Sequence, residues 1–213
     1  MMNPAHGDDP SPRLARASTR KNLDRVLMKA ATLIAEKGFE ATSMRDLSRA
    51  MKMSLAGLYH YFSSKEDLLF QLQFRTFWSL LAQQQKLAAE RGTPEERFAR
   101  LLVGHLRFYA EHTNELKACT FELESLSGSQ YRTIEEPRRR YYELMTSVIA
   151  EVMNGSRKTA ARARESRHAA LFIFGMLNWI FMWYHPERHG SVEKIGEEMC
   201  DLVLNGLRPA RRR

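Results

Sequence analysis

The chain has 213 residues, of which 44% are hydrophobic, and it carries a formal net charge of +8 at pH 7. Its two cysteines, Cys119 and Cys200, lie too far apart in sequence for a disulfide framework or a CxxC zinc site, which favours a reducing cytoplasm. Its most apolar stretch, residues 169–184, is shorter than the roughly 20 residues that a membrane-spanning helix needs, so we expect a buried helix and no membrane partner.

The positive charge is spread along the chain. Residues 1–68 hold 11 Lys and Arg against 8 Asp and Glu, and residues 131–213 hold 15 against 10. A positive net charge permits a nucleic-acid partner but does not identify one. A DNA-binding function must therefore be argued from a motif.

The chain is expected to begin with a disordered lead at residues 1–19, which contain three prolines and no apolar run. A helix follows, because apolar residues recur at helical spacing from Leu23 to Ile34. Gly38 stands where a C-terminal cap belongs, so we expect this helix to end there.

Three helix starts follow one another closely in residues 43–69. Ser43 with Asp46, and Ser63 with Glu66, match the capping-box pattern, and Ser54 opens a short segment between them. Two short helices joined by a tight turn and followed at once by a third indicate a helix-turn-helix, which presents one helix to DNA. We assign residues 20–68 to this DNA-binding domain.

Residues 69–213 are expected to form a second, larger helical domain. Helices are predicted from Ser63 or Ser64 toward Gly92, from Pro94 onward, and over about 114–126, 131–152, 159–184 and 192–207. Pro137 either kinks the fourth of these helices or marks its true start. Because no segment shows the period-2 pattern of a strand, we predict an all-α fold of about nine helices.

The motif residues 41–47, 54–62 and 64–69 together resemble the TetR family of bacterial transcriptional regulators. The resemblance implies a cytoplasmic homodimer, usually a repressor, that leaves a palindromic DNA operator when a small ligand binds its C-terminal domain. One departure is Lys52, where the family often has glycine in the turn. Lysine can serve at this position if its backbone avoids positive φ, and its ammonium then offers a phosphate contact, so the sequence leaves the geometry of the turn open.

The predicted DNA contacts lie on the second and third helices and at the start of the fourth. Small residues let the third helix approach the major groove, and hydroxyl, imidazole and ammonium groups donate to phosphates and base edges. The predicted set is Thr42, Ser43, Arg45, Ser54, Leu55, Ala56, Gly57, Tyr59, His60, Tyr61 and Lys65. Leu58 and Phe62 are expected in the core, Arg45 is either a DNA contact or simply solvated, and the basic residues from Arg13 to Lys21 are expected to reach a neighbouring groove.

The resemblance assigns the last two helices to a homodimer interface and the remainder to a ligand pocket. Residues 178–184 and 201–207 are similar to the ends of TetR-type regulators of fatty-acid and sterol catabolism, which implies a small hydrophobic effector such as an acyl-CoA. The predicted lining is apolar and aromatic. It comprises Phe108, Tyr109, Phe121, Tyr142, Met145, Phe172, Met176 and Trp179. The run 138–140 of three arginines is either a solvated charge run or a contact for CoA phosphates.

No catalytic, cofactor or metal-binding motif is present in the sequence, so we expect no enzyme and no cofactor. An enzyme that uses Glu122 or Glu124 as a base lacks any legible nucleophile. His105 and His112 are expected to be scattered histidines, and Cys119 a buried apolar residue. The alternative function is a helical adaptor that binds another protein through residues 169–207.

Overall fold

The computed structural model describes the backbone of residues 11–154 and 159–207 and the side chains of residues 22–153 and 159–205. Within these ranges the chain forms helices and no strand, which confirms the all-α prediction. The α-helices are α1 (Ser11–Lys37), α2 (Met44–Met51), α3 (Leu55–Tyr61), α4 (Lys65–Ala89), α5 (Pro94–Glu111), α6 (Thr113–Phe121), α7 (Gly128–Asn154), α8 (Ala160–Asn178), α9 (Pro186–His189) and α10 (Val192–Leu207). Two 3-10 helices complete them: η1 (Leu123–Ser125) and η2 (Ile180–Met182).

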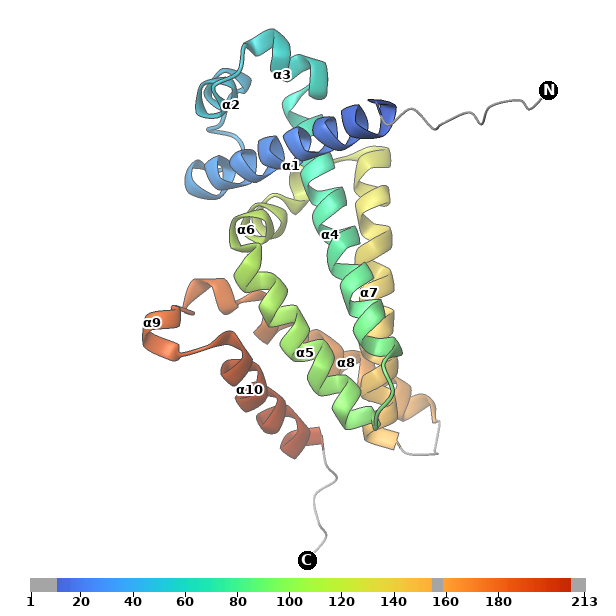
Figure 1. Ribbon diagram of the computed structural model, residues 1–213. Coiled ribbons are helices and arrows are strands. Elements are labelled where there is room, and N and C mark those ends of the chain that lie inside the picture. The colour runs from blue at the N-terminus through green and yellow to red at the C-terminus, as the bar shows by residue number, and fades with distance from the viewer. Residues whose placement is uncertain (1–10, 155–158, 208–213) are drawn as a thin grey trace, which may run out of the picture.

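The helices α1 to α3 form a head at one end of the molecule (Figure 1). From this head α4 runs into the larger C-terminal part, where α4 packs on α5 and α7. There α8 packs on α7, and α10 lies along α5 on the other side. The helix α6 packs under α1 and joins the two parts.

The core of the head is completed by residues from outside it. Buried residues of α1 to α4 share one hydrophobic cluster with Ala118 of α6, with Leu126 and with Ile134 of α7. Three short helices bury too little apolar surface to be very stable alone. The head therefore depends on the rest of the chain to complete its core.

The first helix begins at Ser11, so residues 11–19 of the predicted disordered lead are helical instead. Pro12 occupies the second helical position, where its missing N–H breaks no internal hydrogen bond. Residues 1–10 lie outside the described residues, as do the side chains from Arg13 to Lys21 that were predicted to reach a groove.

The helix caps of the head follow the predicted pattern with one shift. Ser43 forms the capping box with Asp46, and Ser54 accepts from the N–H of Gly57 at 3.0 Å. The cap of α4 is Ser64 and not Ser63, because the Ser64 hydroxyl accepts from the backbone N–H of Asp67. The Asp67 carboxylate in turn accepts from both the N–H and the hydroxyl of Ser63.

Lys52 ends α2 in the left-handed conformation, with φ 55° and ψ 42°. The condition under which lysine was expected to suit this turn, a backbone that avoids positive φ, is not met. Its N–H donates to the carbonyls of Ser48 and Arg49, and this closing turn requires the left-handed backbone whichever residue occupies the position.

Lys52→Gly is therefore expected to stabilise the protein. A residue with a Cβ is destabilised by roughly 1–2 kcal/mol in the left-handed region. Glycine avoids this strain, but it loses more conformational entropy on folding, which offsets part of the gain. We expect the free energy of unfolding, measured by urea denaturation, to rise by about 0.5–1 kcal/mol. Lys52→Ala is the control, because it removes the charge but keeps the Cβ, and it should give no such gain.

Three later boundaries differ from those predicted. The predicted helix 114–126 ends at Phe121 and continues as η1, and the predicted helix 159–184 ends at Asn178 and continues as η2. The helix α7 starts at Gly128 and contains Pro137 in its interior, so the proline does not mark its start. The four-residue helix α9 lies between the predicted helices 159–184 and 192–207, where no helix was predicted. No helix in residues 11–154 or 159–207 is both long and apolar enough to cross a membrane.

Candidate DNA-binding surface and effector cavity

The third helix of the head presents aromatic and small residues outward. Leu58 and Phe62 are both 0% exposed and fill the head core, as predicted. Tyr59 is 49% exposed, and His60 beside it is also exposed. The helical period therefore separates the four consecutive large residues 59–62 into an outward and an inward set.

Most of the predicted DNA contacts lie on this outward surface. Exposed members are Ser43, Arg45, Ser54, Ala56, Tyr59 and His60, and partly exposed ones are Leu55, Gly57, Tyr61 and Lys65. Thr42 does not belong to the surface, because it is 1% exposed and its hydroxyl donates to the Gly38 carbonyl at 2.7 Å. Gly57 also has a local role, since a Cβ there would lie 3.1 Å from the Ser54 hydroxyl that caps α3.

Lys65 has an internal partner that the sequence did not reveal. Its Nζ donates to the carbonyl oxygen of Phe39 at 3.0 Å and lies 4.2 Å from the centroid of the Phe39 ring. A charge-assisted hydrogen bond and a cation–π contact therefore hold the ammonium on the turn between α1 and α2. This placement makes Lys65 a structural residue of the head, and we do not propose it as a phosphate ligand.

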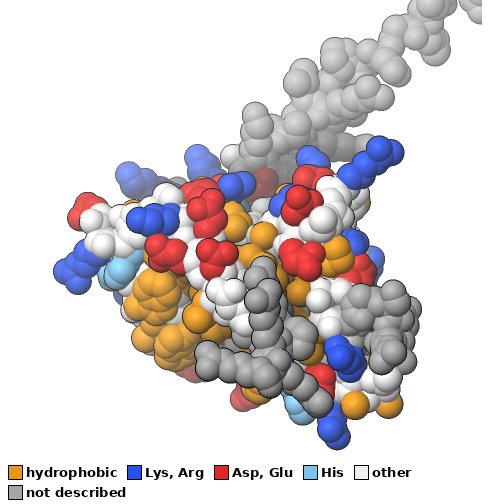
Figure 2. Space-filling model, turned by 90° about the horizontal axis from the view of Figure 1, so that it is seen from below, with side chains coloured by type: hydrophobic (Ala, Val, Ile, Leu, Met, Phe, Trp, Pro, Cys, Tyr) orange, Lys and Arg blue, Asp and Glu red, His pale blue; other side chains and the backbone are white. Residues whose placement is uncertain are grey.

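At the other end of the molecule, α8, η2 and α10 expose large apolar side chains. Leu171, Phe172, Trp179, Met182 and Leu202 are each between 53% and 70% exposed. Seen from the end opposite to the head, hydrophobic side chains gather along one side of the molecule (Figure 2). Exposed apolar surface of this kind marks a site of association. We call the outer surface of α8, η2 and α10 the apolar face.

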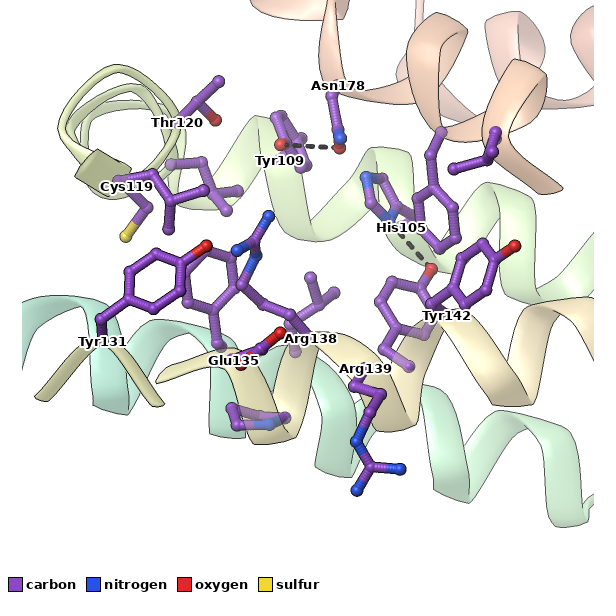
Figure 3. Close-up of a pocket in the computed structure, with 18 residues that line it drawn as sticks. His105, Tyr109, Cys119, Thr120, Tyr131, Glu135, Arg138, Arg139, Tyr142 and Asn178 are labelled. Atoms are coloured by element: carbon purple, nitrogen blue, oxygen red, sulfur yellow. Dashed lines mark hydrogen bonds between the residues drawn. The ribbon is translucent and has the colours of Figure 1, made fainter. Parts of the chain in front are cut away.

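A cavity of about 520 Å³ lies in the C-terminal part, lined by residues of α4 to α8 (Figure 3). Of the eight residues predicted to line a pocket, Tyr109 and Tyr142 do so. Thr120, Leu123, Tyr131 and other residues of α6, η1 and α7 supply walls that the sequence did not single out.

The other six predicted lining residues lie elsewhere. Met145 is 0% exposed within the core, and Phe108 faces a groove beside α4. Phe121 is 59% exposed, with its ring edge-on to Phe181. Phe172, Met176 and Trp179 line the apolar face. For these last three residues the prediction failed because the segment 169–184 is apolar on every side, so its sequence does not fix which side faces the cavity.

The deep end of the cavity is polar and uncharged. His105 is 1% exposed, its ring stacks on that of Tyr109, and its Nδ1 lies 2.9 Å from the Tyr141 hydroxyl. Burial lowers the pKa of His105 to about 3, outweighing the opposite influence of the nearby Asn178 amide. The Tyr109 hydroxyl donates to Asn178 Oδ1 at 3.0 Å, and burial raises the pKa of Tyr109 to about 12.

The buried His105 makes stability depend on pH. Its folded pKa lies below that of the unfolded chain, so the unfolded state binds more protons below about pH 6.5. The contribution of the neutral His105 to the free energy of unfolding is therefore fully present above that pH. It falls on acidification, by about 1 kcal/mol between pH 6 and pH 5. Urea denaturation at both pH values measures this loss. His105→Gln, which does not titrate, should lose much less over the same interval.

The three arginines of the 138–140 run occupy three different environments. Arg138 lines the cavity, its guanidinium lies 5.6 Å from the Phe77 ring centroid, and it forms no ion pair within the described side chains. Arg139 also lines the cavity, but its guanidinium pairs with Glu136 and Glu143. Arg140 lies over the Trp78 ring. Of the three, Arg138 is therefore the one placed to meet a negatively charged group that enters the cavity, and the exposed Glu135 is the acidic residue that lines the same cavity.

Cys119 lies in the wall of the cavity, fully buried. Burial raises the pKa of its thiol to about 12, so the thiol stays protonated at neutral pH. A protonated, buried thiol reacts poorly with oxidants. The residue therefore packs as a small apolar group, as predicted.

The head and the cavity wall are joined at Phe39, which is 2% exposed. The N–H of Phe39 donates to Glu122 Oε1 at 3.0 Å, while its carbonyl accepts from Lys65. Glu122 Oε2 accepts from the Ser125 hydroxyl, and the Glu122 carbonyl accepts from Gln73 Nε2. We call the Glu122–Phe39–Lys65 contact the latch. Leu123, the residue that follows Glu122 in sequence, lines the cavity. Through the latch, the cavity wall is therefore linked directly to the turn that leads into α2.

An exposed helix after a tight turn, a separate apolar face and an internal cavity define a helix-turn-helix regulator with a ligand-binding domain. Residues 26–72 match the family described as bacterial regulatory proteins, tetR family, and residues 91–207 match the tetracyclin repressor-like C-terminal domain. The chain belongs to the TetR family and is a ligand-responsive, DNA-binding transcriptional repressor.

Individual relatives agree with this assignment. The HTH-type transcriptional repressor KstR2 of Mycolicibacterium smegmatis is 24% identical over 189 residues, covering 86% of this chain and 89% of the relative. The crystal structure of the TetR-family regulator PfmR from Thermus thermophilus has a TM-score of 0.75 at 30% identity, covering 87% of this chain and 100% of that one. AibR, crystallised with isovaleryl coenzyme A and operator DNA, has the same fold, with a TM-score of 0.75 at 23% identity over 86% of this chain and 98% of that one.

Proposed function

We propose that two copies of this chain associate through the apolar face and bind a palindromic operator with the two exposed α3 helices. A small hydrophobic effector that enters the cavity releases the DNA. The observation that carries this proposal is the placement of the exposed α3 surface and the apolar face on separate parts of one chain, with the cavity wall linked to the head by the latch. We place this function in the cytoplasm, where operator DNA is accessible.

For the DNA contacts we propose the outward surface of α3 and the start of α2. Tyr59 and His60 offer a hydroxyl and an imidazole, and Ala56 and Gly57 allow close approach of the helix. Arg45 adds an exposed positive charge on α2. A two-fold dimer presents two such surfaces, which requires two half-sites in inverted orientation.

For the effector we propose a compact acyl group, carried as a free acid or as a CoA thioester. The cavity volume of about 520 Å³ lies within the range of small-molecule sites, and its lining is mainly apolar and aromatic. The fold is shared with AibR, whose crystal structure holds isovaleryl coenzyme A. Arg138 offers the cavity a positive charge for the carboxylate or the CoA portion.

The DNA-binding part is tested with Tyr59→Ala. Purified protein first selects its operator from genomic DNA fragments, and the genes that flank the site narrow the effector. We expect the variant to bind that operator about 10-fold more weakly, because a phosphate or base-edge contact contributes roughly 1–3 kcal/mol.

The control for this test is Phe121→Ala, which removes a similarly exposed aromatic ring outside the head. It should bind the operator like the wild type. Equal operator affinity of folded Tyr59→Ala and wild type would mean that α3 does not read DNA through this surface.

A further inference from the structure

The inference concerns the effector and rests on the proposal that the effector occupies the cavity. His105 is a fully buried polar side chain in the wall of that cavity. One ring nitrogen, Nδ1, is engaged by the Tyr141 hydroxyl. The other, Nε2, lies near the Asn178 amide, whose oxygen already accepts from Tyr109, and it makes no hydrogen bond of acceptable geometry in the described part of the chain. Figure 3 shows this second nitrogen on the side of the ring that faces Asn178 and Tyr109.

A buried polar atom without a partner is costly. Leaving it unsatisfied costs roughly 1–3 kcal/mol, and in the unliganded protein solvent in the cavity can supply the bond. A purely apolar effector that displaces this solvent incurs that cost. An effector with an oxygen at the same place avoids it, so the site discriminates between the two classes.

The absence of charge around the His105 ring determines whether the effector oxygen near it is charged or uncharged. The ring of His105 lies against the uncharged side chains of Tyr109, Tyr141, Phe174 and Asn178. Burial keeps the pKa of the imidazole low, so the ring itself is neutral at physiological pH. A carboxylate placed here would lose its hydration without gaining an opposite charge, whereas a carbonyl or hydroxyl loses little.

We propose that the effector carries an uncharged oxygen, a carbonyl or a hydroxyl, within its apolar body, and that this oxygen hydrogen-bonds to His105 Nε2. Arg138 lies beside the Phe77 ring and, unlike Arg139, forms no ion pair among the described side chains, so it is the cavity arginine that meets the negatively charged end of the effector. The ligand class is therefore an oxygenated carboxylic acid or its CoA thioester, and a plain hydrocarbon chain binds more weakly. His105 is a specificity-determining residue for this class.

The test compares matched ten-carbon probes: decanoic acid, 9-oxodecanoic acid and 9-hydroxydecanoic acid, each as the free acid and as the CoA thioester. Calorimetric titration of the wild-type protein is expected to show that an oxygenated probe binds at least about 5-fold more tightly than its decanoyl counterpart. His105→Leu is expected to abolish that preference while still binding decanoyl probes. Arg138→Gln distinguishes the free acids from the CoA thioesters as ligands. If the carboxylate of the free acids meets Arg138, this variant should weaken their binding the most.

A second measurement avoids any variant. In wild-type protein labelled with ¹⁵N-histidine, the oxygenated probe should shift the Nε2 resonance of His105, and the decanoyl probe should shift it much less. A preference for the ketone over the alcohol assigns the proton to Nε2, since a ketone only accepts. Equal affinities for plain and oxygenated probes, with no selective Nε2 shift, would overturn this inference and leave the hydrophobic effector standing. If none of the six probes binds, this inference fails together with the proposed effector, while operator binding remains separately measured.

Discussion

Trp179→Glu is expected to convert the proposed dimer into monomers and to weaken operator binding at least about 100-fold, through the loss of bivalent attachment. Trp179 is 55% exposed in the single chain and belongs to the apolar face with Phe172 and Leu202. In a dimer that covers this face, the new carboxylate would be buried without a partner, which costs several kcal/mol per subunit. A monomer carries one α3 and contacts one half-site, so the combined affinity of two linked heads is lost. Sedimentation equilibrium measures the mass, and a gel-shift titration measures the affinity.

Two further variants test whether the effect of Trp179→Glu is specific to the apolar face. Phe121→Glu places the same charge at a ring that is 59% exposed but lies outside the apolar face, and it should stay dimeric. Gly175→Arg tests the same face, because a Cβ at Gly175 meets no atom within 4 Å in the single chain and so does not disturb its fold. If both face variants remain dimeric, the interface lies elsewhere. A wild-type chain that is monomeric and binds a different protein through residues 169–207 would support the adaptor alternative.

The second large effect is expected at Glu122, the centre of the latch. Glu122→Leu removes the acceptor for the Phe39 N–H and for the Ser125 hydroxyl, so we expect the free energy of unfolding to fall by about 3 kcal/mol. Operator affinity should fall by about 10-fold as well, since the head is then held less firmly on the domain that sets the spacing of the two heads. Urea denaturation and gel-shift titration measure the two effects.

Matched variants separate the contributions to the latch. Glu122→Gln keeps a carbonyl oxygen for the Phe39 N–H and should lose about half as much stability. Lys65→Met keeps the aliphatic stem over the Phe39 ring but removes the ammonium that holds the Phe39 carbonyl. Should Glu122→Leu lose stability and yet bind the operator and respond to effector like the wild type, the latch would stabilise the head without transmitting the signal.

The head was largely predictable because its signals are local. Ser43 and Ser54 cap helices through hydrogen bonds that span three residues, and such bonds can be inferred directly from spacing. The burial of Leu58 and Phe62 beside an exposed Tyr59 follows from the helical period alone. The one-residue error at Ser63 shows the limit of this reading, because two adjacent serines both satisfy the same local pattern.

The cavity was predicted poorly, and the reason is also physical. Its wall draws on five helices, α4 to α8, and which side of each helix faces inward depends on how the helices pack. Met145 and Tyr142 lie one turn apart on α7, yet Tyr142 lines the cavity and Met145 is in the core. His105 could have been singled out, since it lies one helical turn before Tyr109, which was predicted to line the pocket. Its importance depends on Tyr141, 36 residues away in sequence.

The all-α fold, the helix-turn-helix and the outward surface of α3 could all be inferred from the amino-acid sequence, because caps, turns and helical periodicity act over a few residues. Three features were revealed only by the tertiary structure. Lys65 is bound to Phe39, and Glu122 joins the head to the cavity wall. His105 Nε2 lies in that wall without a hydrogen-bond partner of acceptable geometry among the described residues. Each of these depends on side chains brought together from distant segments. Such contacts form only when the helices have packed, and no local pattern encodes them.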